Sequence, residues 1–202
     1  MKNQKTDIIE VCWELFFQFG IKSVTMDDIA CKLGISKKTI YQHFNNKNDL
    51  VEQALEWQIN HPSFSFQSME VSHLNAIDQY IAFYKFVISQ IENSCDSMMY
   101  DLRKYYPRIW NKFHLTTLAK FQKELFLNLK KGTEEGLFRP EMNIEWISKT
   151  IARFYMNMAE SDSIIIEKDD MANIDYHKEL VLYHLHGICT SNGIEYVKNN
   201  FK

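Results

Sequence analysis

Apolar residues recur every three or four positions along almost the whole chain, the spacing of one helix face. Residues 60–72 lose this periodicity and predict a linker or loop. Only 6 Gly and 3 Pro occur, fewer turn residues than strand-rich chains usually need. We therefore predict an all-α protein with a small N-terminal domain, residues 1–57, and a larger helical domain, residues 58–202. The expected helices cover residues 6–19, 26–33, 37–44, 47–57, 73–93, 95–105, 107–131, 143–160, 174–190 and 192–200.

Two of the short helices carry complete start and stop signals. Thr25 with Asp28 three residues later is a capping-box pattern, and Gly34 suits a left-handed helix exit. Ser36 then caps the next helix after a turn of three to four residues. This arrangement is typical of a helix-turn-helix, whose second helix reads DNA. One apolar seam can form from Ile29, Leu33, Ile35, Ile40 and Phe44.

The charge pattern supports a local rather than a general affinity for nucleic acid. The net charge is −3 and the pI is near 6.2, which argues against a generally basic binder. Between Asp28 and Asp49, however, no acidic residue occurs, while Lys32, Lys37 and Lys38 fall in that window. A basic face of this kind can hold phosphates although the domain is neutral.

Residues 24–50 closely resemble the DNA-binding domain of the TetR family of transcriptional regulators. The family pattern runs roughly T-x-x-x-I-A-x-x-x-G-[VI]-S-x-x-[TS]-[LI]-Y-x-[YH]-F-x-x-K-x-x-L, and the chain follows it from Thr25 to Leu50. One departure is Lys38, where the family often has glycine. The matching positions are Thr25, Ile29, Ala30, Gly34, Ile35, Ser36, Thr39, Ile40, Tyr41, His43, Phe44, Lys47 and Leu50.

The resemblance implies specific contacts with double-stranded operator DNA. Thr25, Tyr41, His43 and Lys47 would hold the DNA backbone. The base edges or neighbouring phosphates would be met by Lys37, Lys38, Thr39 and Gln42. Because no arginine precedes Arg103, the reading helix lacks the commonest guanine reader, and we predict half-sites that rely on A/T contacts and DNA shape.

The larger domain is rich in aromatic residues and methionine, which fits either a ligand cavity or a plain aromatic core. The resemblance favours a cavity, and the few charges favour a hydrophobic or aromatic effector. The candidate pocket residues are Phe83, Tyr84, Val87, Met99, Leu102, Trp110, Phe113, His114, Phe121, Phe154, Tyr155 and Met158.

The resemblance also implies a homodimer, with the helices near residues 143–160 and 174–190 in a four-helix interface. The alternative is that both are ordinary core helices. Helix-turn-helix proteins commonly read palindromes as two-fold dimers, which favours the interface. The candidate interface residues are Ile147, Ile151, Val181, His184, Leu185 and Ile188.

Other functional classes find little support. The four cysteines are far apart, no apolar run approaches membrane-spanning length, and the N-terminus is not a signal peptide, so we expect a cytoplasmic protein that does not enter membranes. No P-loop, HExxH, GxGxxG or GxSxG motif occurs, so we expect no enzyme, no cofactor and no metal site.

We therefore expect a ligand-responsive regulator, a repressor by family resemblance. Ligand binding would respace the two reading heads of the dimer, with the helix over residues 47–57 as the lever. The alternative is a helical protein that binds a small molecule or a partner and whose helix-turn-helix no longer reads DNA.

Overall fold

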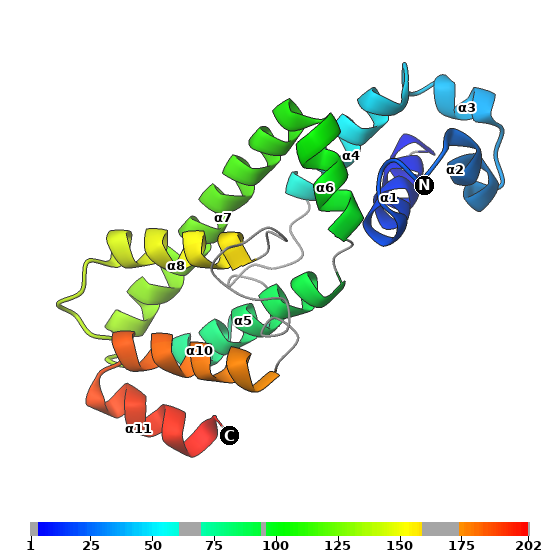
Figure 1. Cartoon of the computed structure of the whole chain (residues 1–202). Coiled ribbons are helices and arrows are strands. Elements are labelled where there is room, and N and C mark those ends of the chain that lie inside the picture. The colour runs from blue at the N-terminus through cyan, green and yellow to red at the C-terminus, as the bar shows by residue number, and fades with distance from the viewer. Residues whose placement is uncertain (1–3, 61–69, 94–95, 159–173, 202) are drawn as a thin grey trace. The chain divides into compact units, whose positions relative to one another are not determined.

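The computed structural model describes residues 4–60, 70–93, 96–158 and 174–201, and this part of the chain is mostly helical (Figure 1). Outside the helices, these residues form one isolated antiparallel bridge, between Phe138 and Cys189. The all-α prediction is confirmed. The helices are α1 (Gln4–Phe19), α2 (Met26–Leu33), α3 (Lys37–Tyr41), α4 (Lys47–Asn60), α5 (Ala76–Asn93), α6 (Asp96–Tyr105), α7 (Pro107–Glu134), α8 (Ile144–Met158), α10 (Ile174–Ile188) and α11 (Ser191–Asn200).

The chain divides into two compact units. Unit 1 comprises residues 1–62 and 94–117, and unit 2 comprises residues 63–93 and 118–202. Unit 1 therefore contains α6 and the first part of α7 in addition to the N-terminal helices. The sequence predicts two domains separated by one boundary, after residue 57.

Unit 1 has its core between α1, α2, α4 and α6. Fully buried side chains from three of these helices meet there, with Phe16 on α1, Ile29 on α2 and Leu102 on α6. The most numerous helix–helix contacts of the described residues lie between α1 and α4. Within this core α2 packs against α1, and α3 packs against α2.

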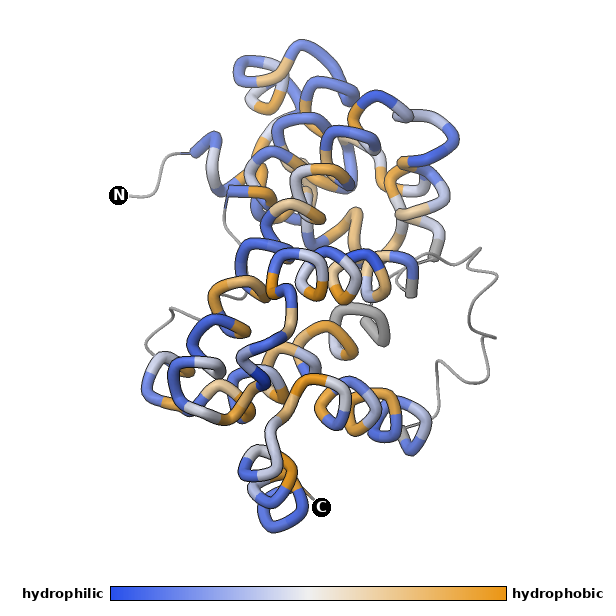
Figure 2. The backbone as a smooth tube through the Cα atoms, turned by 90° about the vertical axis from the view of Figure 1, so that its left-hand side faces the viewer, coloured by the Kyte–Doolittle hydropathy of each residue, from blue (hydrophilic) through white to orange (hydrophobic). Residues whose placement is uncertain are grey.

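Unit 2 has a separate core built on α5. Tyr80 and Phe83 of α5 pack with Leu129 of α7, Tyr155 of α8 and Leu185 of α10, all of them buried. Blue and orange segments alternate along the helices in Figure 2, as expected for elements that bury one face each. None of the described helices is long and apolar enough to cross a membrane.

Local signals place the helix boundaries. Pro107 is the first residue of α7, where its missing N–H would have no partner within the helix. Thr190 caps α11 by accepting a hydrogen bond from the Gly193 N–H at 3.2 Å. The helix predicted over residues 37–44 is shorter in the structure, where α3 ends at Tyr41. Turn hydrogen bonds from the N–H groups of His43 and Phe44 to the Ile40 carbonyl follow it. Residues 61–69, 94–95 and 159–173, which include parts of the predicted linker and helices, lie outside the described residues.

Candidate nucleic-acid interface

A reciprocal pair of hydrogen bonds fixes the start of α2. The Thr25 hydroxyl oxygen accepts from the Asp28 N–H at 3.1 Å, and an Asp28 carboxylate oxygen accepts from the Thr25 N–H at 2.7 Å. The Thr25 hydroxyl also donates to that carboxylate at 2.7 Å. The two bonds that the carboxylate accepts, from the Thr25 N–H and hydroxyl, hold the pKa of Asp28 below its usual value, since they favour the ionised form. The predicted capping box is therefore present.

A left-handed glycine sets the turn between α2 and α3. Gly34 has φ +65° and ψ +29°, and its N–H donates to the carbonyl of Cys31 at 3.2 Å. The Ile35 N–H returns to the Ala30 carbonyl at 3.0 Å, which closes the end of α2. Ser36 then caps α3, its hydroxyl oxygen accepting from the Thr39 N–H at 3.1 Å. The two helices are thus joined by three residues in one defined geometry.

One face of α3 is exposed and polar. Lys38, Tyr41 and Gln42 lie three and four positions apart, so they share a face of the helix. The Tyr41 side chain is 46% exposed, and Ile40 on the opposite face is fully buried. Within the described residues, these three exposed side chains make no hydrogen bond. A lysine, a phenol and an amide are therefore presented together to a partner.

Two further predicted contact residues lie beside this face with partners of their own. The Lys37 ammonium donates to an Asp27 carboxylate oxygen at 2.9 Å, and this bond raises the pKa of Lys37. The Thr39 hydroxyl lies 2.8 Å from that of Ser36. For Lys37 to contact DNA, it would have to exchange Asp27 for a phosphate or a base.

His43 and Lys47 contact other segments of unit 1. His43 Nε2 lies 3.3 Å from the side-chain oxygen of Gln4 on α1. The Lys47 ammonium donates to the Val24 carbonyl at 2.5 Å, and its partial burial lowers the pKa of Lys47. In this structure Lys47 links the start of α4 to the loop before α2.

A residue that sequence reasoning did not single out holds the same loop. Asp101 of α6 is only 6% exposed, and its carboxylate accepts from the Lys22 N–H at 2.7 Å. Asp101 also lies within electrostatic range of Lys47. Its position in the sequence offered no signal, because the contact joins residues 79 positions apart.

The predicted pocket residues fall into both units. In unit 1, Leu102 is buried, and Met99, Trp110 and Phe113 pack against the same core; the His114 ring lies 5.4 Å from that of Trp110. In unit 2, the side chain of Met158 lies outside the described residues. The other unit 2 candidates belong to its aromatic core, namely Phe83, Tyr84, Val87, Phe121, Phe154 and Tyr155.

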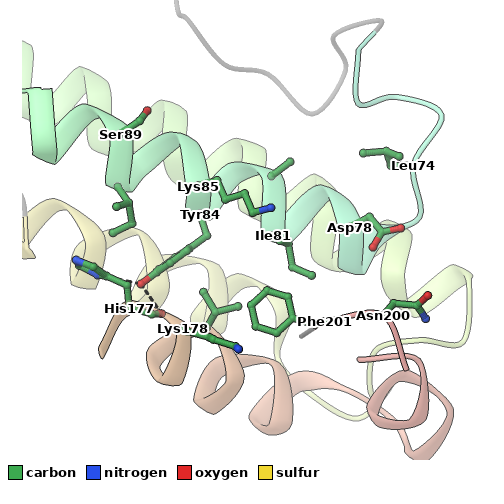
Figure 3. A pocket seen from close by; sticks show the side chains of 13 residues that line it. Leu74, Asp78, Ile81, Tyr84, Lys85, Ser89, His177, Lys178, Asn200 and Phe201 are labelled. Carbon is green, nitrogen blue, oxygen red and sulfur yellow. Dashed lines mark hydrogen bonds between the residues drawn. The ribbon is translucent and has the colours of Figure 1, made fainter. Parts of the chain in front are cut away.

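A groove of about 660 Å³ does occur in unit 2, between α5 and α10 (Figure 3). Among the predicted pocket residues whose side chains the structure describes, Tyr84 is the one that lines it. Its hydroxyl donates to the His177 carbonyl at 2.6 Å, while His177 Nδ1 lies 3.1 Å from the same hydroxyl. The groove also takes in the last helix and Phe201, which sequence periodicity gave no reason to place there.

The predicted dimer residues lie mostly inside their own unit. Ile151, Val181, Leu185 and Ile188 are buried within the unit 2 core, and Ile147 packs against it. His184 lies against Tyr80 and Tyr155 in the same core. The large aromatic residues that α8 and α10 expose are instead Trp146, at 69%, and Tyr183, at 75%.

Comparisons with known proteins agree with this architecture. Residues 8–54 match the family model for bacterial regulatory proteins of the tetR family. The chain is 21% identical over 154 residues to the HTH-type transcriptional repressor KstR2 of Mycobacterium tuberculosis, covering 75% of this chain and 77% of that protein. It is 38% identical over 52 residues to the HTH-type transcriptional regulator TtgR of Pseudomonas putida, covering 26% of this chain and 25% of that protein.

A solved structure shows the same fold over nearly the whole chain. The TetR-family transcriptional regulator from Cytophaga hutchinsonii superposes with a TM-score of 0.69 at 18% identity, covering 93% of this chain and 95% of that one. The capped α2, the glycine turn and the exposed face of α3 thus define a helix-turn-helix DNA-binding regulator. Residues 8–54 thus form a DNA-binding domain of the tetR family of bacterial regulatory proteins. The relatives of this chain are named as regulators, which agrees with the expectation that it is not an enzyme.

Proposed function

We propose that this protein is a cytoplasmic repressor that binds a palindromic operator as a homodimer and releases it when a small ligand binds. The observation that carries the proposal is the face of α3 formed by Lys38, Tyr41 and Gln42, because it presents three DNA-binding groups without internal hydrogen-bond partners in the described structure. KstR2 is named a transcriptional repressor, which supports repression as the direction of regulation.

The chemistry of this face fits contact with double-stranded DNA. A Gln amide can pair with the adenine edge in the major groove, and Lys can approach guanine or a phosphate. Tyr41 can donate its hydroxyl to a phosphate oxygen. Since α3 contains no arginine, we expect operator half-sites with few strong guanine contacts.

A homodimer is part of the proposal for two reasons. One α3 contacts only a few base pairs, so a second copy is needed for a specific site of useful affinity. In addition, α8 and α10 each expose a large aromatic side chain, Trp146 and Tyr183, which association would bury.

The ligand would act by a shift between conformations of the dimer that differ in the spacing of their reading heads. Such a shift needs the ligand to bind one conformation better than the other, and couplings of about 1–3 kcal/mol are typical. A coupling of this size would change operator affinity about 5–150-fold.

Selection of bound sequences from a random pool of DNA duplexes, at two salt concentrations, tests the DNA-binding proposal. The wild-type protein should enrich a palindromic motif, and Tyr41→Ala should lose it. Tyr100→Ala is a matched control, since Tyr100 is equally exposed, at 49%, on α6 of the same unit. On the selected operator, Lys38→Gln should reduce the slope of log affinity against log salt by about 1 if Lys38 holds a phosphate.

The absence of enrichment at both salt concentrations would contradict the proposal. That result would favour the alternative function, in which the helix-turn-helix no longer reads DNA and the protein binds a small molecule or a partner through unit 2.

A further inference from the structure

The groove between α5 and α10 combines an apolar floor with two cationic side chains. Ile81 and Ala82 of α5, Val181 of α10 and the ring of Phe201 line it. Lys85 of α5 and Lys178 of α10 line it too, as Figure 3 shows. A volume of about 660 Å³ lies within the range of sites for small organic molecules.

Most other polar groups of the groove already have partners in the structure. The Asp78 carboxylate accepts from the Tyr196 hydroxyl at 2.7 Å and from the Asn75 amide at 3.0 Å. The Tyr84 hydroxyl donates to the carbonyl of His177 at 2.6 Å. These groups are therefore poor receptors for a further polar ligand.

The two lysines of the groove, unlike these polar groups, are available to a charged ligand. In the part of the chain that the structure describes, neither Lys85 nor Lys178 has an ion-pair partner. Two lysines and one aspartate give the charged side chains of the groove a net charge of +1, which a single negative charge would balance. Such a charge can lie near the ammonium groups while an apolar chain or ring covers the floor.

We propose that this groove binds an amphipathic monocarboxylate, a molecule with an apolar chain or ring and one carboxylate group held by Lys85 and Lys178. The binding site stands independently of DNA recognition. The further step, that such a molecule is the effector that releases the operator, rests on the proposed function.

Calorimetric titration with decanoate tests the site, with 1-decanol as the uncharged control of equal chain length. Lys85→Gln and Lys178→Gln should each weaken decanoate binding about threefold to tenfold and leave decanol binding within about twofold. Lys123→Gln is the matched control, because Lys123 is an exposed lysine of the same unit outside the groove, and it should change neither. Decanoate binding that neither groove variant weakens, or equal binding of decanol and decanoate, would overturn the proposal.

A second variant tests the location of the apolar part. Ala82→Phe should fill the groove and weaken decanoate and decanol together, at least about tenfold, because the new ring would occupy the space of the chain. Ala119→Phe, at an exposed position on α7, should leave both unchanged. Undiminished binding to a folded Ala82→Phe protein would place the ligand elsewhere and refute the site.

The effector role needs a separate measurement. Decanoate should lower the affinity of the wild-type protein for its selected operator, and the Lys85→Gln, Lys178→Gln double variant should be far less sensitive. Operator affinity that saturating decanoate leaves unchanged would overturn the effector role only. Failure to bind any DNA would instead contradict the proposed function, while the calorimetric result would still decide the site.

Discussion

His184 shows how the fold of unit 2 controls the charge of a single residue. Its Nδ1 lies 3.2 Å from the hydroxyl oxygen of Tyr80 on α5 and 3.3 Å from that of Tyr155 on α8. Burial lowers the pKa of His184 to about 4 from an ordinary value of 6.5. A neutral ring can accept a hydrogen bond from either hydroxyl, so the structure favours the uncharged form at neutral pH.

This shift predicts a loss of stability in mild acid. Between pH 6.5 and about 4 the unfolded chain takes up a proton at His184 that the folded chain does not, so the free energy of unfolding should fall as the pH falls. The contribution of His184 to that fall is up to roughly 3 kcal/mol. Urea unfolding at several pH values, compared between the wild type and His184→Gln, isolates this contribution.

The control for the acid experiment is His186→Gln, at an exposed histidine on the same helix. It should keep the pH dependence of the wild type, whereas His184→Gln should flatten the curve across this window. Parallel curves for the wild type and His184→Gln would show that His184 is accessible to protons in the folded protein.

At the scale of the element, sequence reasoning was most successful where the signal is local. The capping box at Thr25, the left-handed exit at Gly34 and the cap at Ser36 are all present as predicted. A cap depends on residues within four positions of one another, so the sequence alone contains its cause. The same holds for Pro107 at the start of α7.

Contacts between distant segments could not be predicted in this way. The hydrogen bond from the Lys22 N–H to Asp101 joins α6 to the loop after α1 within unit 1, yet neither residue has a distinctive local pattern. The sequence likewise selected Leu102 and Tyr155 together as candidate pocket residues but could not say that they belong to different cores. Whether a ligand contacts any of them stays a prediction.

The turn between α2 and α3 predicts a specific effect of one methyl group. In Gly34→Ala, an L residue must adopt φ +65°, which costs about 1 kcal/mol, or the turn must change and shift α3 relative to α2. Apart from Gly34 itself and its two neighbours in the chain, nothing lies within 4 Å of the added Cβ, so the effect comes from the backbone rather than from a clash. We expect lower stability in urea and about threefold to tenfold weaker operator binding.

Gly136→Ala is the matched control for the turn. Gly136 has φ +70°, and its Cβ would also meet nothing within 4 Å, but it lies in unit 2. It should lose similar stability and retain operator affinity. Gly34→Asn should fall between the wild type and Gly34→Ala, because Asn tolerates the left-handed region better than Ala. If both alanine variants bind DNA equally well, the geometry of this turn is not needed for recognition.

At the scale of the whole molecule, the proposed homodimer depends on faces of α8 and α10 that a single chain leaves exposed. Sequence reasoning selected apolar residues of these helices, but the structure shows that Ile151, Val181 and Leu185 are already buried within the chain. Periodicity identifies an apolar face without saying which neighbour covers it. The exposed residues Trp146 and Tyr183 are therefore the sharper test of association.

Trp146→Glu and Tyr183→Glu should each convert the dimer into monomers. A buried carboxylate without a partner costs several kcal/mol, which raises the dissociation constant of the dimer at least about 100-fold. Sedimentation velocity should give twice the chain mass of 24.0 kDa for the wild type and the chain mass for the variants. Leu115→Glu is the control, since Leu115 of α7 is also largely exposed, at 64%, but lies in unit 1. Variants that remain dimeric and keep full operator affinity would place the interface on another surface, because loss of the second reading head must weaken binding to a palindrome.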